Sequence, residues 1–100
     1  MPFYTYILFS QIINKFYIGA TSLNPIERLE EHNQIKFSDA FTRKGIPWEV
    51  FFVIECISFQ QAKSIELHIK KMKSIKYIEN LKLYPDISLN LLKKYGAPDS

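Results

Sequence analysis

Several features are scarce in this chain of 100 residues. It has one cysteine and three glycines, and no apolar stretch approaches the roughly 20 residues that span a membrane. A single cysteine excludes an internal disulfide. Because Cys56 lies in an apolar run at 50–57, a buried thiol in a reducing cytoplasm is favoured over a reactive nucleophile. The amino-terminal residues lack the basic segment of a secretory signal, so we expect a cytoplasmic protein.

The length and composition fit one globular domain. One hundred residues can bury one core, and no linker, repeat or change in composition divides the chain. Hydrophobic residues make up 47% and charged residues 23%, and the five prolines and three glycines exclude a collagen-like chain. We predict a single domain over residues 1–100, with a core at about 3–76 and a helical extension at about 77–100.

The net charge of +3 is unevenly distributed. Basic and acidic residues balance in residues 1–50, at five each, whereas residues 51–100 carry eight lysines against five acids. Five of these lysines lie between Lys63 and Lys76, where Glu66 is the only carboxylate. Such a stripe suits a phosphate backbone and equally suits a solvated helix face, so charge alone leaves both alternatives open.

Three segments have the composition of β-strands. Aromatic and β-branched residues predict strands at 3–9 and 16–21, joined as an antiparallel hairpin. The apolar run at 48–57 predicts a central strand. Residues 35–47, which end in Gly45-Ile46-Pro47, are predicted to form a loop.

Helix-start signals divide most of the remaining chain. Asn24 can cap a helix whose first residue is Pro25, and this helix is expected to end near Gln34. Further helices are predicted at 59–74 with Ser58 as cap, at 75–83 as a separate helix or a continuation, and at 86–95. The order β-β-α-β-α-α predicts an α/β (α+β) domain with a small three-stranded antiparallel sheet flanked by helices.

The predicted hairpin places two tyrosines close together. If its turn is centred near residues 11–12, Tyr6 lies opposite Tyr17, and both phenols project from one face of the sheet. Gly19 shares that face, and a glycine within a strand indicates a close approach to the backbone by a phosphate, a ligand or a helix. The alternative is two ordinary strand tyrosines and a packing glycine.

The first predicted helix carries two further polar candidates. Arg28 and His32 are four residues apart and so share a helix face, whereas Glu27, Glu30 and Glu31 are expected to point elsewhere. A planar, permanently charged guanidinium at the rim of the core suits a phosphate and the charge of a phosphodiester transition state. The alternatives are an arginine paired with Glu31 or Glu27, and a hydrogen-bonded helix histidine.

Glu66 flanks the apolar stripe of the long predicted helix. A carboxylate at the edge of the core and near cations stays ionised, and it is a hard ligand for Mg²⁺ or Mn²⁺. Since Mg²⁺ takes only one or two protein carboxylates, a single glutamate is sufficient. The alternative is a simple Glu66–Lys70 ion pair along the helix.

Five segments follow one another in the order of a known family. They are Tyr4-Thr5-Tyr6-Ile7-Leu8, Phe16-Tyr17-Ile18-Gly19-Ala20-Thr21, Arg28-Leu29-Glu30-Glu31-His32-Asn33, Phe41-Thr42-Arg43-Lys44-Gly45-Ile46-Pro47-Trp48, and 62–73 with Glu66. This set resembles the GIY-YIG nuclease superfamily, and within it the small single-domain bacterial branch of URI-type or YhbQ-like proteins. Tyr4 and Thr5 stand where the first family motif has glycine and isoleucine.

The resemblance implies a role for each matching residue. Tyr6 and Tyr17 line the site, and one of them orients or deprotonates the attacking water. Arg28 contacts the scissile phosphate, and His32 transfers a proton or contacts the phosphate. Glu66 binds the divalent metal, Mg²⁺ or Mn²⁺. The mechanism requires these groups to meet in one cleft, and the choice of general base among Tyr6, Tyr17 and His32 stays open.

The resemblance also implies nucleic-acid contacts around this site. Gly19 lets the backbone of the substrate pass close by, and further contacts come from Arg43, Lys44, Lys70 and Lys73. Many relatives place an asparagine late in the domain, and both Asn80 and Asn90 are available for that position.

We therefore predict a metal-dependent endonuclease that hydrolyses DNA phosphodiester bonds. The DNA is expected to be recognised by structure rather than by sequence, in DNA repair or recombination. Two alternatives belong to other classes of protein. One is a nucleic-acid-binding module that keeps the fold without cutting, and the other is an interaction partner that docks through its C-terminal helices.

Overall fold

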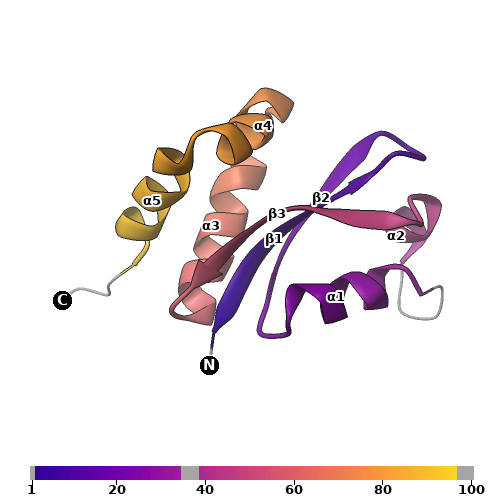
Figure 1. Cartoon of the computed structure of the whole chain (residues 1–100), viewed down its shortest axis with the longest axis horizontal. Helices are drawn as coiled ribbons and strands as arrows, with labels where there is room; N and C mark the ends of the chain where they lie inside the picture. Colours follow the sequence, from indigo (N-terminus) through magenta and orange to yellow (C-terminus); the bar gives the residue numbers. More distant parts are fainter. Residues whose placement is uncertain (1, 35–38, 97–100) are drawn as a thin grey trace.

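Three antiparallel strands form one sheet, with helices on both of its faces (Figure 1), in a computed structural model that describes residues 2–34 and 39–96. In chain order the elements are β1 (Phe3–Ser10), β2 (Lys15–Thr21), α1 (Pro25–His32), α2 (Ala40–Lys44), β3 (Trp48–Cys56), α3 (Phe59–Met72), α4 (Ile75–Leu83) and α5 (Pro85–Lys94). The sheet order is β2-β1-β3. The predicted α+β class, with a small three-stranded antiparallel sheet flanked by helices, is confirmed.

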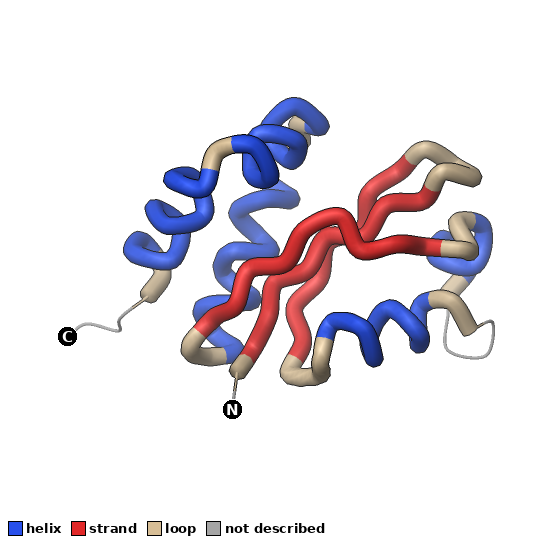
Figure 2. Tube along the Cα trace, viewed as in Figure 1, coloured by secondary structure: helices blue, strands red, loops and turns tan. Residues whose placement is uncertain are grey.

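The two faces of the sheet carry separate apolar clusters. Because side chains alternate along a strand, Ile7 of β1 faces the larger cluster, which includes Ile65 of α3. Tyr6 and Leu8 face the other way and pack with Trp48. Figure 2 shows the sheet between α3, α4 and α5 on one side and α1 and α2 on the other.

The register of the hairpin differs from the prediction by two residues. Tyr6 lies opposite Gly19, and Leu8 lies opposite Tyr17, because the turn is formed by residues 11–14. A shift of two residues keeps each side chain on its predicted face, whereas a shift of one exchanges the faces. Tyr6 and Tyr17 therefore share one face of the sheet although they are not directly opposite.

β3 is an edge strand, and the prediction of a central strand is wrong. Its sequence is mostly apolar because helices cover both faces of the sheet, even at an edge, and its two glutamates, Glu49 and Glu55, are exposed. The register between β1 and β3 shifts after Ile7, which pairs with Phe52, whereas Leu8 pairs with Val50. Phe51 is the extra residue of this β-bulge, and it packs on the same side of the sheet as Phe52.

Side-chain caps begin two of the helices as predicted. Ile26 N donates to Asn24 Oδ1 at 2.8 Å at the start of α1, and Gln61 N donates to Ser58 Oγ at 3.0 Å at the start of α3. Each bond satisfies an amide that has no partner within the first helical turn. α1 ends at His32, slightly before the predicted end.

The short helix α2 lies where the sequence predicts a loop. Asp39 caps it by accepting a 2.8 Å hydrogen bond from Thr42 N, and Gly45 ends it. A helix of five residues is too short to show a helical period of apolar side chains, so only the cap could have indicated it. Residues 35–38 of the same predicted loop lie outside the described residues.

Two further helices follow α3 on the same side of the sheet. α4 is a separate helix and not a continuation, because Lys73 adopts the left-handed backbone conformation (φ 50°) that ends α3. α5 packs back against α3, where Gln61 Nε2 donates to Leu92 O at 2.9 Å. The bounds of α4 match the predicted segment, and α5 begins and ends one residue earlier than predicted.

The single cysteine and the described helices agree with two expectations from the sequence. Cys56 is buried at the end of β3, and burial raises the pKa of its thiol, which fits the predicted buried cysteine. Over residues 2–34 and 39–96, every helix is too short or too polar to cross a bilayer.

Candidate active site

Two tyrosines from neighbouring strands lie side by side on the face covered by α1. The ring centroids of Tyr6 and Tyr17 are 6.3 Å apart, and the ring planes differ by 22°. Tyr6 on the middle strand is 1% exposed, whereas Tyr17 on an edge strand is half-buried. The ring of His32 packs edge-on against Tyr17 with centroids 4.5 Å apart. Tyr17 is therefore the tyrosine of this pair that a substrate can reach.

Gly19 provides the space that the Tyr6 phenol fills. A Cβ atom at residue 19 would overlap the hydroxyl oxygen and the ring edge of Tyr6. The sequence predicts a close approach to this backbone, and the group that approaches is the phenol of the opposing strand. Gly19 is itself buried, and its contact with nucleic acid stays a prediction.

The Tyr6 hydroxyl is the centre of a hydrogen-bond network with α1. Arg28 Nε donates to Tyr6 Oη at 3.1 Å, and Tyr6 Oη lies 3.0 Å from His32 Nε2. Because a guanidinium can only donate, Tyr6 Oη accepts from Arg28, and in the tautomer of His32 with its proton on Nδ1 the phenol donates its own hydrogen to Nε2. Arg28 and His32 reach Tyr6 from one face of α1, as their spacing predicts.

Burial keeps Tyr6 and His32 uncharged near neutral pH. Desolvation raises the pKa of Tyr6 to about 12, although the hydrogen bond and positive charge of Arg28 act in the opposite direction. Desolvation lowers the pKa of His32 to about 4, and the charge of Arg28 adds to this shift. Burial alone lowers the pKa of Arg28, but its bonds to Tyr6 and Glu31 raise it by more. The site thus combines a neutral phenol, a neutral imidazole and a permanent cation.

The pKa of His32 predicts a pH-dependent stability. The folded pKa of about 4 lies below the unfolded value of about 6.5, so the unfolded chain binds more protons between these values. The free energy of unfolding is therefore expected to be highest above pH 6.5 and to fall by about 3 kcal/mol as the pH drops toward 4. Urea unfolding followed by Trp48 fluorescence measures this slope.

A variant at each histidine separates this contribution from other titrations. His32→Gln is expected to lose most of the slope between pH 4 and about 6.5, whereas His68→Gln keeps the larger part of it, because burial on α3, away from the network, lowers the pKa of His68 by less. An unchanged slope in His32→Gln contradicts the assignment.

One edge of the Arg28 guanidinium remains available. Nη1 donates to Glu31 Oε1 at 2.6 Å, which corrects the expectation that Glu31 points elsewhere, since residues three apart are neighbours on a helix. The Arg28 side chain is 33% exposed, so this ion pair orients the guanidinium more than it stabilises the fold. Among residues 2–34 and 39–96, no acceptor binds Nη2.

Glu66 extends from α3, which covers the opposite face of the sheet (Figure 1). It is 3% exposed, with Lys70 Nζ 2.5 Å from Oε2 and Lys63 Nζ 3.1 Å from Oε1. Besides burial, the charge of Glu66 contributes to the raised pKa of Tyr6, so the carboxylate and the phenol are within electrostatic reach. The Glu66–Lys70 pair left open by the sequence is formed.

The structure therefore meets the expectation of one common cleft only in part. The tyrosines, Arg28 and His32 gather on the α1 face. Within the described part of the chain, Glu66 makes no hydrogen bond or ion pair with any of them. The reason is that the apolar stripe of α3, which includes Ile65, packs on the other face of β1.

The order of these residues along the chain matches a known family. The family model described as the GIY-YIG catalytic domain matches residues 2–78. The chain belongs to the GIY-YIG family. The matched segment includes every residue of the site described above and ends within α4. Membership indicates a nuclease-type function in general. No curated protein and no solved structure matches the chain, and its place in the URI-type branch stays a prediction.

GIY-YIG nucleases generally depend on a divalent metal ion, and Glu66 fits such an ion. Oε1 of Glu66 is buried and has no hydrogen-bond partner in the described part of the chain, because the nearby Lys63 ammonium lies outside hydrogen-bond geometry. A carboxylate oxygen with a free lone pair is the hard ligand that Mg²⁺ or Mn²⁺ takes. No cluster of three His, Cys, Asp or Glu side chains suited to a metal occurs within 2–34 and 39–96. A single carboxylate of this kind fits Mg²⁺ or Mn²⁺, which would take its other ligands from water and substrate oxygens.

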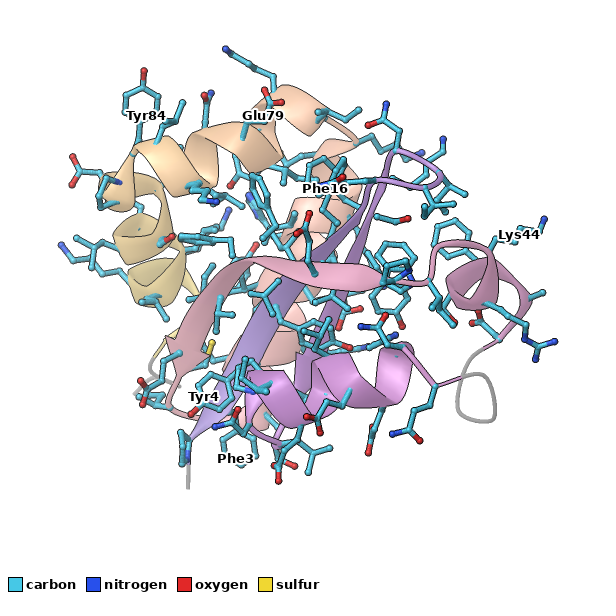
Figure 3. The ribbon with its side chains drawn as sticks, turned by 45° about the vertical axis from the view of Figure 1, so that its right-hand side comes forward. Phe3, Tyr4, Phe16, Lys44, Glu79 and Tyr84 are labelled. Atoms are coloured by element: carbon cyan, nitrogen blue, oxygen red, sulfur yellow. The ribbon has the colours of Figure 1, made fainter. Side chains whose placement is uncertain are left out.

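The predicted nucleic-acid contacts lie in two separate places. Lys70 and Lys73 are exposed at the end of α3, next to Glu66. Arg43 and Lys44 are exposed on α2, which covers the other face of the sheet; Figure 3 labels Lys44 at the far end of the domain. The structure does not bring these two basic groups together.

The two asparagines that the sequence left open lie away from the tyrosines. Asn80 is on α4 and Asn90 is on α5, both on the face of the sheet opposite Tyr6. Among the described side chains, neither asparagine hydrogen-bonds to a predicted site residue.

The sequence reasoning missed residues that support the tyrosine cluster. Asn33 clamps the backbone of Trp48, since Trp48 N donates to Asn33 Oδ1 at 2.6 Å and Asn33 Nδ2 donates to Trp48 O at 3.0 Å. The Trp48 ring in turn packs edge-on against Tyr17, with centroids 6.1 Å apart. The position of Asn33 directly after the helix was the only signal for this clamp, whereas Glu31 was indicated by its spacing from Arg28.

Proposed function

We propose that this GIY-YIG domain is a divalent-metal-dependent endonuclease that hydrolyses phosphodiester bonds of DNA. The observation that carries the proposal is the Arg28 guanidinium, which Tyr6 and Glu31 hold in a fixed orientation and whose Nη2 has no acceptor among the described residues. A planar cation fixed before the substrate arrives suits the charge that develops on a phosphate during hydrolysis. We place the activity in DNA repair or recombination, on DNA recognised by its structure.

The chain's own residues then divide the chemistry as follows. Arg28 binds the scissile phosphate, and Tyr17, the more exposed of the two tyrosines, orients the attacking water. Tyr6 and His32 act as positioning residues, because the Tyr6 phenol is buried and bonded to both α1 side chains. Glu66 would hold the metal, which supplies charge neutralisation to the phosphate when bound.

β2 is an edge strand that lies between Glu66 on α3 and the Tyr6, Tyr17 and Arg28 side chains on the α1 face. β2 contributes Tyr17 to the α1 face, and it packs against α3 on the opposite face. We propose that the DNA strand lies along this edge, so that it reaches Arg28 and Tyr17 on one side and Glu66 on the other. The contribution of the Glu66 charge to the raised pKa of Tyr6 is consistent with this arrangement.

DNA cleavage tests the proposed function. Purified protein is expected to cut at least one of linear, nicked or branched DNA in the presence of Mg²⁺ or Mn²⁺, and EDTA is expected to stop the reaction. The measurement is product formation on denaturing gels over time. Binding of these DNAs without cleavage under every metal condition contradicts the proposal.

A non-catalytic nucleic-acid-binding module is the second candidate. The observation that favours it is the double ion pair of Glu66 with Lys63 and Lys70, which is a purely structural use of the carboxylate. In that case the wild-type protein and a Glu66 variant bind DNA equally and neither cuts it.

A further inference from the structure

Two adjoining cavities lie between β2 and the junction of α3 with α4. The first, which we call the basic groove, has a volume of about 260 Å³ and carries three lysines, Lys15, Lys70 and Lys73. The second, the aromatic pocket, has a volume of about 310 Å³. Its lining residues are Phe9, Asn14, Phe16, Phe51, Ile75 and Glu79. Phe16, Asn14 and Ile75 line both cavities, so the two spaces share a wall.

Local features of the sheet form the aromatic pocket. The β-bulge in β3 turns Phe51 toward this side, where its ring packs edge-on against Phe16 with centroids 5.0 Å apart. The ring of Phe9, which pairs with Phe16 across the hairpin, also packs against it, with centroids 4.9 Å apart. Figure 3 shows Phe16 near the turn of the β1–β2 hairpin, on the side of the sheet where Glu79 of α4 lies.

The two cavities have complementary chemistry. Ammonium groups on an open groove suit phosphates, and each neutralised phosphate releases counterions. Aromatic walls suit a nucleobase, since base–aromatic stacking is the usual contact with unpaired nucleotides. The Glu79 carboxylate repels a phosphate, yet it can accept a hydrogen bond from an exocyclic amino group of a base. The aromatic pocket therefore fits a base, and the basic groove fits the phosphates on either side of it.

We infer that these cavities bind an unpaired nucleotide of the DNA substrate, with its base in the aromatic pocket and its flanking phosphates on Lys15 and Lys73. The inference deepens the proposed function and rests on it. Lys70 connects the two sites, because it lines the basic groove and pairs with Glu66. A nucleotide held there lies next to the proposed metal ligand, which directs cleavage to DNA with a flap, a branch or an end.

Binding without cleavage tests the inference directly. The probes are fluorescein-labelled oligonucleotides of roughly ten nucleotides, as single-stranded dC and dT and as a blunt duplex, measured by anisotropy in EDTA. The wild-type protein is expected to prefer single strands. Lys15→Ala/Lys73→Ala is expected to weaken single-strand binding about tenfold and to reduce the slope of log K against log salt by about 1.4.

A second pair of lysines provides the matched control. Lys71→Ala/Lys93→Ala removes the same charge from exposed positions that line neither cavity, and it is expected to change single-strand affinity much less. Equal losses in the two double variants, or equal affinity of the wild type for single strand and blunt duplex, overturn the inference. Both lysine pairs are exposed, so these variants fold normally, unlike Phe16, which packs against the core.

Glu79 gives an independent readout of the base. The wild type is expected to bind dC a few-fold more tightly than dT, because only cytosine presents an exocyclic amino group, and Glu79→Ala is expected to remove this preference. Equal binding of dC and dT by the wild type overturns the role of Glu79. If the lysine variants lose single-strand binding while no DNA is cut, the proposed endonuclease activity is contradicted, whereas nucleotide binding by the two cavities is supported. If DNA is cut and the lysine variants bind single strands normally, only the inference about nucleotide binding is contradicted.

Discussion

Glu66→Gln is expected to lower the rate of DNA cleavage by about 10²- to 10³-fold while leaving DNA affinity equal or slightly higher. Glutamine keeps the shape of the side chain but removes the charge that a divalent cation needs. The loss of the ion pairs to Lys63 and Lys70 costs about 1 kcal/mol or less, because both lysines are half exposed. Single-turnover cleavage rates and anisotropy measure the two effects separately.

The matched control is Glu55→Gln, which removes one exposed carboxylate from β3. Its cleavage rate is expected to stay within about twofold of the wild type. A Glu66→Gln protein that cuts as fast as Glu55→Gln shows that the carboxylate has no part in hydrolysis.

Arg28→Lys is expected to lower the cleavage rate by about 10²-fold although the positive charge is retained. Lysine has no Nε–H to donate to Tyr6 Oη, and its ammonium cannot bind Glu31 and a phosphate through one planar group. Cleavage rates at saturating DNA measure the chemical step, and thermal unfolding checks that the fold is intact.

Glu30→Gln, on an exposed position of the same helix, is the control for this variant. It is expected to cut at nearly the wild-type rate. If a folded Arg28→Lys protein cuts at that rate as well, a point charge is sufficient and the fixed orientation described above is not needed.

Local signals predicted the elements of this fold well. Asn24 and Ser58 marked helix starts because a cap is a short-range interaction, and the aromatic strands followed from their composition. The same holds for Arg28 and His32, whose four-residue spacing places both on Tyr6. Features of this kind depend on neighbours within one turn or one strand.

Tertiary packing decided the features that the sequence did not predict. The hairpin register depends on which residues form the turn. The face of the sheet that α3 covers depends on the packing of its apolar side chains against Ile7. The bulge at Phe51 and the clamp of Asn33 on Trp48 arise between segments distant in sequence. The separation of Glu66 from the tyrosines could not be predicted for the same reason.

The alternation along β1 separates two kinds of sequence constraint within a single strand. Tyr6 serves the site, and its immediate neighbour Ile7 serves the large apolar cluster. Tyr6 and Leu8 are as deeply buried as Ile7, so a substitution at Tyr6 alters the site and the smaller apolar cluster together. The larger cluster around Ile7, by contrast, can be repacked without changing a side chain that contacts Arg28 or His32.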